Sequence, residues 1–243
     1  MIKKTINYCW FGHGKKSELI LKCIESWKKY CPDYDIVEWN EDNYDIHKNK
    51  YMEEAYNNKK WAFVSDYARL DIIYNNGGIY LDTDVELIKS MDKIIEGKKA
   101  FFCVENEYIN TGLGFGAEKG CLILKELLES YDKTSFVKSD GTLDVLSCPV
   151  RNDTVFKNYI DKSKINEIQI VNNIYFYPKE YFCPLDYETK ILNKTSETVG
   201  IHWYGESWLT PQKRLKKKLK RIYVRIFGIN SFNKIKSYIK RGR

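Results

Sequence analysis

The sequence has 243 residues, of which 43% are hydrophobic and 30% charged, and it carries a net charge of +7. This composition is that of an ordinary globular protein, and the length suits one α/β domain with a substantial core. Seven cysteines are scattered without paired spacing, which argues against structural zinc and favours a reducing, cytosolic environment. The N-terminus has no signal-peptide pattern and no apolar run reaches the roughly 18 residues of a membrane-spanning helix, so a cytoplasmic protein is expected.

The first 60 residues predict two strands and at least one helix. Residues 2–11 are rich in β-formers and predict a strand that ends before a glycine-containing turn. A helix over 17–30 follows, with Ser17 as its N-cap, and residues 35–39 predict a second strand. Residues 40–58 are polar and predict a loop with a short helix.

The next segment combines a helix, a turn and a short strand. A helix over 61–75 ends at Asn75-Asn76-Gly77-Gly78, where Asn and Gly supply the left-handed conformations of a C-cap. The apolar Ile79-Tyr80-Leu81 then predicts a strand. Asp82 and Asp84 therefore lie in the loop that leaves the carboxyl end of this strand.

Two pairs of charged side chains in this segment suit the binding of a metal-bound diphosphate. Asp82 and Asp84 offer the oxygen ligands that Mg²⁺ and Mn²⁺ prefer, and the ion would convert carboxylate–phosphate repulsion into attraction and stabilise the departing diphosphate. Asp66 and Arg69 are three residues apart and share one face of the helix. The alternatives are a solvated pair of loop carboxylates and an ion pair on the helix surface.

The second half of the chain is richer in predicted strands. Residues 110–116, NTGLGFG, look too irregular and glycine-rich for the centre of a buried strand; the glycines would let the backbone approach a ligand closely, and a hairpin is the alternative. The segment matches neither a Walker nor a dinucleotide fingerprint. Early alternation of strands and helices indicates a mixed-sheet α/β nucleotide-binding domain, in which ligands bind beyond the carboxyl ends of the strands. The remaining predicted elements are strands over 100–104, 168–171, 174–177 and 198–203 and helices over 118–131 and 153–160.

Four segments of the chain resemble glycosyltransferase family 32, whose members share a sugar-binding region containing an Asp-x-Asp motif. They are INYCWFG at 6–12, Ser65-Asp66-x-x-Arg69, GGIYLDTD at 77–84, and a late His202 followed by Ser207-Trp208, and they occur in family order. The family includes yeast initiating mannosyltransferases and bacterial capsular polysaccharide transferases, and its plan is similar to that of the glucosylating domain of large clostridial toxins. The resemblance implies a GT-A fold with a mixed, mostly parallel central sheet. It also implies a nucleotide-sugar donor, here favoured as a UDP-sugar, with Mn²⁺ or Mg²⁺ and retention of the anomeric configuration.

The resemblance further implies roles for the residues of the donor site. Asp84 would bind the metal directly, while Asp82 would assist and would contact the ribose or the donor sugar. His202 is a candidate to complete the metal shell, and a structural role on its strand is the alternative. Asp66 and Arg69 would hold the hydroxyls of the donor sugar and the phosphates, with Arg69 acting as a fixed fork of several donors.

Four aromatic and hydroxyl side chains are implied to enclose the nucleotide. Tyr8 and Trp10 would line the pocket for the base, and Ser207 and Trp208 would close over the diphosphate. For the two tryptophans, positions in the hydrophobic core are the alternative.

The acceptor side is less defined, and it bears on the mechanism. This chain has Ser147-Cys148-Pro149 where the family carries a Thr-Gly-Pro-like segment, so Asn110 and Asp153 are only candidates there. No second carboxylate is placed under the anomeric carbon as a retaining glycosidase would require. The hypothesis is therefore front-face transfer, in which Arg69 and the metal stabilise the leaving diphosphate and its oxygen helps to deprotonate the acceptor hydroxyl.

The charge is divided between an acidic body and a basic tail. Residues 211–243 contain thirteen Lys and Arg and no acidic residue; since the whole chain carries +7, residues 1–210 carry −6. We therefore expect a GT-A domain over 1–210 and a basic amphipathic helical tail over 211–243, suited to an anionic membrane surface. Tethering to the inner face of a bacterial cell membrane would bring the enzyme to a glycan or lipid-linked glycan acceptor in capsule or surface polysaccharide synthesis.

Two other classes of function remain as alternatives. The first is nucleic-acid or membrane binding through the basic tail with a non-catalytic body, although the acidic body argues against a large nucleic-acid groove. The second is a metal-dependent phosphohydrolase, although the chain lacks the denser ligand set of a two-metal site.

Overall fold

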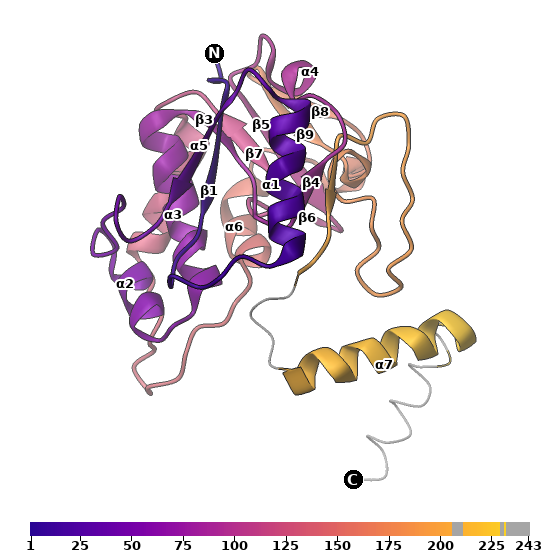
Figure 1. The fold of residues 1–243 in the computed structure, drawn as a ribbon. Helices are drawn as coiled ribbons and strands as arrows, with labels where there is room; N and C mark the ends of the chain where they lie inside the picture. Colours follow the sequence, from indigo (N-terminus) through magenta and orange to yellow (C-terminus); the bar gives the residue numbers. More distant parts are fainter. Residues whose placement is uncertain (206–210, 229–230, 232–243) are drawn as a thin grey trace.

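The computed structural model describes residues 1–205, 211–228 and 231, and its centre is a mixed eight-stranded sheet (Figure 1). The strands follow the order β2-β1-β3-β7-β5-β9-β8, with β6 paired to β5. A second sheet pairs β10 with β4. The strands of the large sheet are β1 (Thr5–Cys9), β2 (Asp35–Trp39), β3 (Gly78–Tyr80), β5 (Ala100–Glu105), β6 (Tyr108–Ile109), β7 (Phe115–Ala117), β8 (Gln169–Val171) and β9 (Ile174–Tyr177), and those of the small sheet are β4 (Val85–Leu87) and β10 (Gly200–His202).

Most strands of the large sheet run in one direction. β1 is parallel to both β2 and β3, with Ile6 opposite Ile36 on one side and Ile79 on the other. β5 is parallel to β9, whereas β7 is antiparallel to β3 and β5, so β1, β2, β3, β5 and β9 all point the same way. The predicted mixed, mostly parallel sheet is confirmed.

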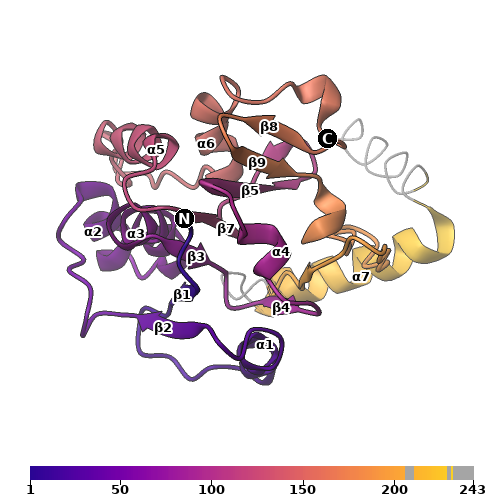
Figure 2. The same cartoon turned by 90° about the horizontal axis from the view of Figure 1, so that it is seen from above.

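Helices cover both faces of this sheet. Seen from above, α2, α3 and α5 lie on one side of the sheet and α1 and α4 on the other (Figure 2). Each side has its own hydrophobic core, one formed mainly with α2, α3, α5 and α6 and the other with α1, α4 and the small sheet. The helices are α1 (Glu18–Tyr30), α2 (Lys50–Asn57), α3 (Trp61–Asn76), α4 (Asp92–Ile95), α5 (Leu122–Asp132), α6 (Cys148–Phe156) and α7 (Pro211–Phe227), with 3₁₀ turns at Lys162–Lys164 and Lys179–Tyr181.

Local sequence signals set the ends of the first helices. The Ser17 hydroxyl accepts a hydrogen bond from the backbone N–H of Ile20 and caps α1, as predicted. α3 ends at Asn76 and is capped by Gly77, whose positive φ of 70° glycine adopts without strain. The helix over 61–75 and the strand after it are confirmed.

Two predictions from the middle of the chain are wrong. Phe115 and Gly116, the last two residues of the glycine-rich segment, belong to β7 (Phe115–Ala117), a buried strand between β3 and β5, whereas residues 110–114 are outside any strand. Gly116 is required there because a Cβ at this position would lie 2.6 Å from Cε1 of Phe101 on β5. α6 starts at Cys148, five residues earlier than predicted, since Pro149 fits the first turn of a helix.

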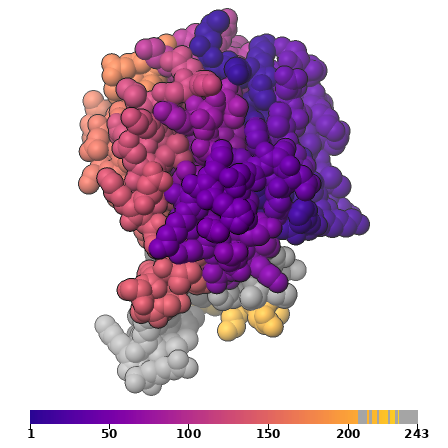
Figure 3. Space-filling view, turned by 90° about the vertical axis from the view of Figure 1, so that its left-hand side faces the viewer, coloured from indigo at the N-terminus to yellow at the C-terminus, as the bar shows by residue number. Residues whose placement is uncertain are grey.

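The surface beside α2 joins two segments that are far apart in sequence. Asn49 Nδ2 donates to Asp132 Oδ1 at 2.9 Å, and the backbone N–H of Val137 donates to Glu54 Oε2 at 2.9 Å. In Figure 3 the purple α2 segment accordingly lies beside the rose-coloured segment that follows α5. These hydrogen bonds join the separate segments of the layer that covers α3.

α7 lies below the main body in Figure 1, on the side toward which β1 runs. Lys220 Nζ forms an ion pair with Glu188 Oε2 at 2.5 Å, and the Lys217 ammonium lies 4.5 Å from the centre of the Tyr187 ring. None of the helices in the described part of the chain has both the length and the apolar character needed to cross a membrane.

Candidate active site

The Asp-x-Asp loop lies at the carboxyl end of β3, between β1 and β7 in the sheet. The Tyr80 hydroxyl, on the last residue of β3, donates to Asp82 Oδ1 at 2.9 Å. The backbone N–H of Asp82 donates to the carbonyl of Gly112 at 3.2 Å. The Asp82 side chain is 31% exposed, so it is held by the protein and still open to a ligand.

Asp66 and Arg69 approach this loop from α3. Arg69 Nη2 lies 2.5 Å from Asp66 Oδ1, and Nη1 lies 3.6 Å from Asp82 Oδ1. Arg69 Nε also donates to the carbonyl of Ser65 at 2.8 Å, which fixes the guanidinium plane. Both side chains of the pair are buried, so the alternative of an ion pair on the helix surface is wrong.

The buried Asp66 carboxyl has an unusual proton affinity. Burial raises its pKa to about 6, although the neighbouring Arg69 charge opposes this rise. A buried acid held beside a fixed guanidinium can accept hydrogen bonds from sugar hydroxyls when it is ionised.

His202 reaches the loop from the small sheet. β10 pairs with β4, which begins directly after Asp84, so His202 lies opposite Val85. His202 Nε2 is 3.4 Å from Asp84 Oδ1, while Asp84 Oδ2 accepts the backbone N–H of Gly205 at 2.7 Å. Ligand atoms of Asp82, Asp84 and His202 all lie within 4.8 Å of one another.

Asp84 and His202 stabilise each other's charged form. Burial alone would raise the pKa of Asp84, but the His202 charge and the Gly205 N–H lower it to about 2. Burial alone would lower the pKa of His202, but the carboxylates of Asp84 and Glu105 raise it well above its usual range. The protonated His202 ring therefore supplies a positive charge between the carboxylates of Asp84 and Glu105.

This group of side chains fits a divalent cation. Two carboxylates and one imidazole form a compact set of oxygen and nitrogen donors, which suits Mn²⁺ and, through its oxygens, Mg²⁺. A cation would replace the proton that His202 shares with Asp84. Asp82, Asp84 and His202 would hold it.

The glycine-rich segment closes one side of the site. A Cβ on Gly112 would lie 2.5 Å from Arg69 Nη1 and 2.5 Å from Asp82 Oδ2, so only glycine fits against these two side chains. Asn110 Oδ1 accepts the N–H of Gly112 at 2.8 Å. The predicted close approach of the backbone is therefore to Arg69 and Asp82, which are themselves site residues.

The acceptor-side candidates have different surroundings. Asn110 is buried, and its Nδ2 donates to Glu105 Oε2 at 2.5 Å. Asp153 forms an ion pair with Lys162 at 2.7 Å. The neighbouring Asn152, which the sequence did not single out, is fully buried, and its Nδ2 donates to Thr111 Oγ1 at 3.2 Å.

The residues expected to enclose the nucleotide are only partly described. Tyr8 is buried, and its hydroxyl donates to Glu38 Oε2 at 2.5 Å. Trp10 is half-buried at the end of β1, with the Lys16 ammonium 5.3 Å from its ring centre. Ser207 and Trp208 lie outside the described residues.

Glu105 and Tyr80 are site residues that sequence reasoning missed. Both stand at the carboxyl end of an apolar strand, the same position that singled out Asp82. A polar residue that ends a buried strand was therefore an available signal at residue 105.

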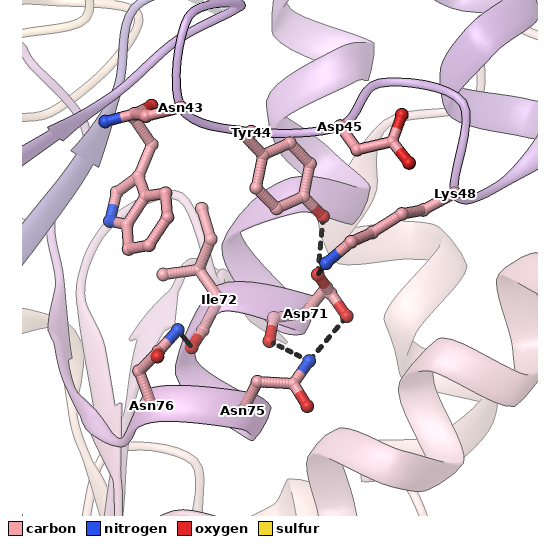
Figure 4. A pocket seen from close by; sticks show the side chains of 9 residues that line it. Asn43, Tyr44, Asp45, Lys48, Asp71, Ile72, Asn75 and Asn76 are labelled. Atoms are coloured by element: carbon pink, nitrogen blue, oxygen red, sulfur yellow. Dashed lines mark hydrogen bonds and ion pairs between the residues drawn. The ribbon is translucent and has the colours of Figure 1, made fainter.

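A cavity of about 400 Å³ lies beside the C-terminal half of α3, away from the Asp-x-Asp loop (Figure 4). In its wall, Asp71 accepts hydrogen bonds from Tyr44 Oη at 2.7 Å, Lys48 Nζ at 3.0 Å and Asn75 Nδ2 at 2.7 Å. Because Asp71 is already satisfied by three protein donors, it is not poised to bind a cation. The cavity is lined by Trp39, Asn43, Tyr44, Asp45, Lys48, Asp71, Ile72, Asn75 and Asn76.

Comparison with known proteins points to one class. Residues 17–101 match the family described as "Glycosyltransferase sugar-binding region containing DXD motif", and this match spans about a third of the chain. No curated protein sequence matches the chain. Among solved structures, PaToxG glycosyltransferase has a TM-score of 0.53 at 20% identity, over 68% of this chain and 72% of that one.

Two other solved structures are more distant. A glycosyltransferase involved in the glycosylation of the major capsid of PBCV-1 has a TM-score of 0.47 at 13% identity, over 89% of this chain and 98% of that one. The galactosyltransferase LgtC in complex with donor and acceptor sugar analogs has a TM-score of 0.39 at 10% identity, over 89% and 93%.

The fold, the Asp-x-Asp site and the family match support a glycosyltransferase of the GT-A type, and the predicted fold class is confirmed. The family match implies a nucleotide-sugar donor and a divalent metal ion.

Proposed function

We propose that this chain is a metal-dependent, retaining glycosyltransferase of family 32 that moves a sugar from a UDP-sugar to a glycan acceptor. The observation that carries the proposal is the grouping of Asp82, Asp84 and His202 within 4.8 Å, next to the buried guanidinium of Arg69. The choice of uridine and of a surface polysaccharide as the product rests on the family resemblance.

The side chains would divide the work between binding and electrostatics. A divalent cation held by Asp82, Asp84 and His202 would supply Lewis-acid stabilisation of the diphosphate. Arg69 keeps a fixed positive charge beside Asp82 and Asp66. Asp66 would accept hydrogen bonds from the donor sugar. Because these groups are already in place, little reorganisation is needed when charge develops on the leaving group.

Retention is proposed to proceed on the front face of the sugar. Among the described residues around the loop, the carboxylates of Asp66 and Asp82 are paired with Arg69, and that of Glu105 faces His202. Each is thus engaged in holding another site residue rather than free to act as a nucleophile. Trapping of a covalent glycosyl-enzyme on any of the three would contradict this mechanism.

Thermal unfolding with UDP or GDP, each with Mn²⁺ or with EDTA, tests the proposal. A ligand at about 100 times its Kd adds about 2.7 kcal/mol to the stability of the folded state, which is seen as a higher melting temperature. We expect a Mn²⁺-dependent shift with UDP that is lost in Asp84→Ala. Glu129→Ala on the exposed face of α5 is the matched control and should keep the shift. A protein that responds to neither nucleotide would overturn the proposal.

We also propose that α7 attaches the enzyme to an anionic membrane surface, where a lipid-linked acceptor would be available. Four apolar residues, Leu215, Leu219, Ile222 and Ile226, are exposed at the spacing of one helix face, and the tail around them is strongly basic. The inner face of a bacterial cell membrane is the location that this proposal requires.

A further inference from the structure

Glu105 stands behind His202, on the side opposite the Asp-x-Asp loop. It is the last residue of β5, and its Oε2 lies 3.6 Å from His202 Nδ1. The other ring nitrogen, Nε2, faces Asp84 Oδ1 at 3.4 Å. The imidazole is therefore placed between two carboxylates, with one nitrogen toward each.

His202 Nδ1 needs a partner from this direction. The side chain is 10% exposed, and Nδ1 is buried with no hydrogen-bond partner inside normal bonding distance. A buried donor without an acceptor is costly, and the Glu105 carboxylate is the acidic group that faces it. A shift of a few tenths of an ångström would turn the 3.6 Å contact into a hydrogen bond.

Both members of this pair are held by further contacts. Glu105 Oε2 accepts Asn110 Nδ2 at 2.5 Å, which fixes the carboxylate. The ring of Tyr204 lies 4.2 Å from the His202 ring, and the Tyr204 hydroxyl is 2.9 Å from Cys183 Sγ. The backbone of His202 is fixed by the pairing of β10 with β4.

We propose that Glu105 is a positioning residue: it accepts the proton on Nδ1 of His202 and so directs the Nε2 lone pair toward Asp82 and Asp84, where a divalent cation binds. The inference rests on the proposed function. A carboxylate behind a metal-binding histidine fixes its tautomer and ring orientation, and its loss typically weakens metal binding 10- to 100-fold. The sequence shows that Glu105 ends an apolar strand, but it does not show that His202 is its partner, because His202 lies on another sheet.

A rival use of the same residues is a separate soft-metal site. Ligand atoms of Glu105, Cys183 and His202 also lie within 4.8 Å of one another. In that site His202 Nδ1 would be the ligand and Nε2 would carry the proton. Nε2 could then not bind a cation together with Asp82 and Asp84. Hard Mn²⁺ or Mg²⁺ prefers carboxylate oxygen to a thiol, so the two uses respond differently to Cys183→Ser.

The affinity for Mn²⁺, measured from the electron paramagnetic resonance signal of the free ion with and without UDP or GDP, tests the inference. We expect Glu105→Ala to weaken Mn²⁺ binding about 10- to 100-fold. Glu105→Gln, whose amide oxygen can still accept from Nδ1, should recover part of the loss. Glu107→Ala removes an exposed carboxylate from the same turn and is the matched control, and Cys183→Ser should bind as the parent protein does. Melting curves of each variant show that the fold is kept.

A spectroscopic readout separates positioning from a general loss of structure. The ring-nitrogen chemical shifts of His202, recorded with Mg²⁺ and UDP, should show a proton on Nδ1 in the parent protein. In Glu105→Ala, at the same Mg²⁺ concentration, a smaller fraction of the His202 rings should carry their proton on Nδ1 alone, because less of the variant holds the ion.

The outcomes test the positioning role of Glu105 separately from the proposed transferase function. If the parent protein binds Mn²⁺ and Glu105→Ala binds it no more weakly than Glu107→Ala, the positioning role is wrong while the transferase proposal stands. If Cys183→Ser loses as much Mn²⁺ affinity as Glu105→Ala, the soft-metal site replaces it. If the parent protein binds no Mn²⁺ with UDP or with GDP, the proposed function itself fails.

Discussion

Asp66 shows how a single residue at the site can be kept at the expense of stability. It is buried beside Arg69, yet its pKa is raised from 3.8 to about 6 because burial disfavours the carboxylate more than Arg69 favours it. A group whose pKa rises on folding binds its proton more tightly in the folded state. Its contribution to stability is therefore fully present below about pH 4 and is lost as the pH rises through 6.

Asp66→Asn should consequently be stabilised relative to the parent protein at neutral and alkaline pH, while its activity falls. Asparagine approximates the protonated acid, so its advantage in free energy of unfolding should be larger at pH 8 than near pH 4 by on the order of 3 kcal/mol. Urea unfolding of both proteins at the two pH values measures this difference. If the advantage of Asp66→Asn in free energy of unfolding is independent of pH, or is larger in acid, the charge of Arg69 fully offsets the cost of burying the Asp66 carboxylate.

The sequence could reveal some of the site residues but not others. Asp82, Asp84, Asp66 and Arg69 lie within one helix–turn–strand segment, and the spacing within each pair, together with the family resemblance, singled them out. Glu105 comes from a later strand, and its approach to His202 depends on the order of strands in two sheets, which no local spacing encodes.

At the scale of elements, β7 is where local reasoning failed. A glycine in a strand interior weakens it, which argued against a buried strand over residues 110–116. In the fold, Gly116 faces the ring of Phe101 on the neighbouring β5, and that ring occupies the space of a side chain. Tertiary packing therefore overrides propensity at this position.

Gly116→Ala should destabilise the protein by about 1–3 kcal/mol, the usual cost of extra volume in a packed core. The added Cβ would lie 2.6 Å from the Phe101 ring and 3.0 Å from the Gly78 carbonyl. Replacing the Phe101 ring by the smaller leucine side chain, in Gly116→Ala/Phe101→Leu, should recover part of the lost stability. A double-mutant cycle in urea measures the coupling between the two positions.

Gly14→Ala is the control for that cycle, since a Cβ there meets nothing within 4 Å. Its unfolding free energy should stay within about 0.5 kcal/mol of the parent value. Purely additive losses for Gly116→Ala and Phe101→Leu would mean that the ring does not set the glycine requirement.

Elements with strong local signals were predictable in a way that β7 was not. α1 has a serine N-cap and a regular apolar face, and α3 has a glycine C-cap, so one end of each helix is encoded nearby. β4 is only three residues long and directly follows the Asp-x-Asp loop. Its existence depends on pairing with β10, a strand more than a hundred residues later.

At the scale of the whole molecule, the charge is separated between body and tail. α7 turns Lys217, Lys220 and Arg221 toward Tyr187 and Glu188 of the body. Its apolar stripe is left exposed, from 47% at Ile222 to 67% at Ile226. An apolar stripe in a basic segment has the character of a helix that lies in the headgroup region of an anionic bilayer.

Binding of the full chain to lipid vesicles should accordingly need both negative lipid and the apolar stripe. We expect co-sedimentation with vesicles rich in phosphatidylglycerol, weak binding to phosphatidylcholine alone, and a decrease from 0.1 to 0.5 M NaCl because salt screens the electrostatic attraction. Replacing Leu215, Leu219 and Ile222 together by serine should weaken binding by roughly tenfold or more, since apolar burial supplies the salt-resistant part. Leu122→Ser on α5, which is 71% exposed, removes an apolar side chain far from this stripe and should change nothing. If the triple variant binds as the parent does while RNA competes with the vesicles, the tail acts through charge alone, and tethering to a membrane-bound acceptor loses its physical basis.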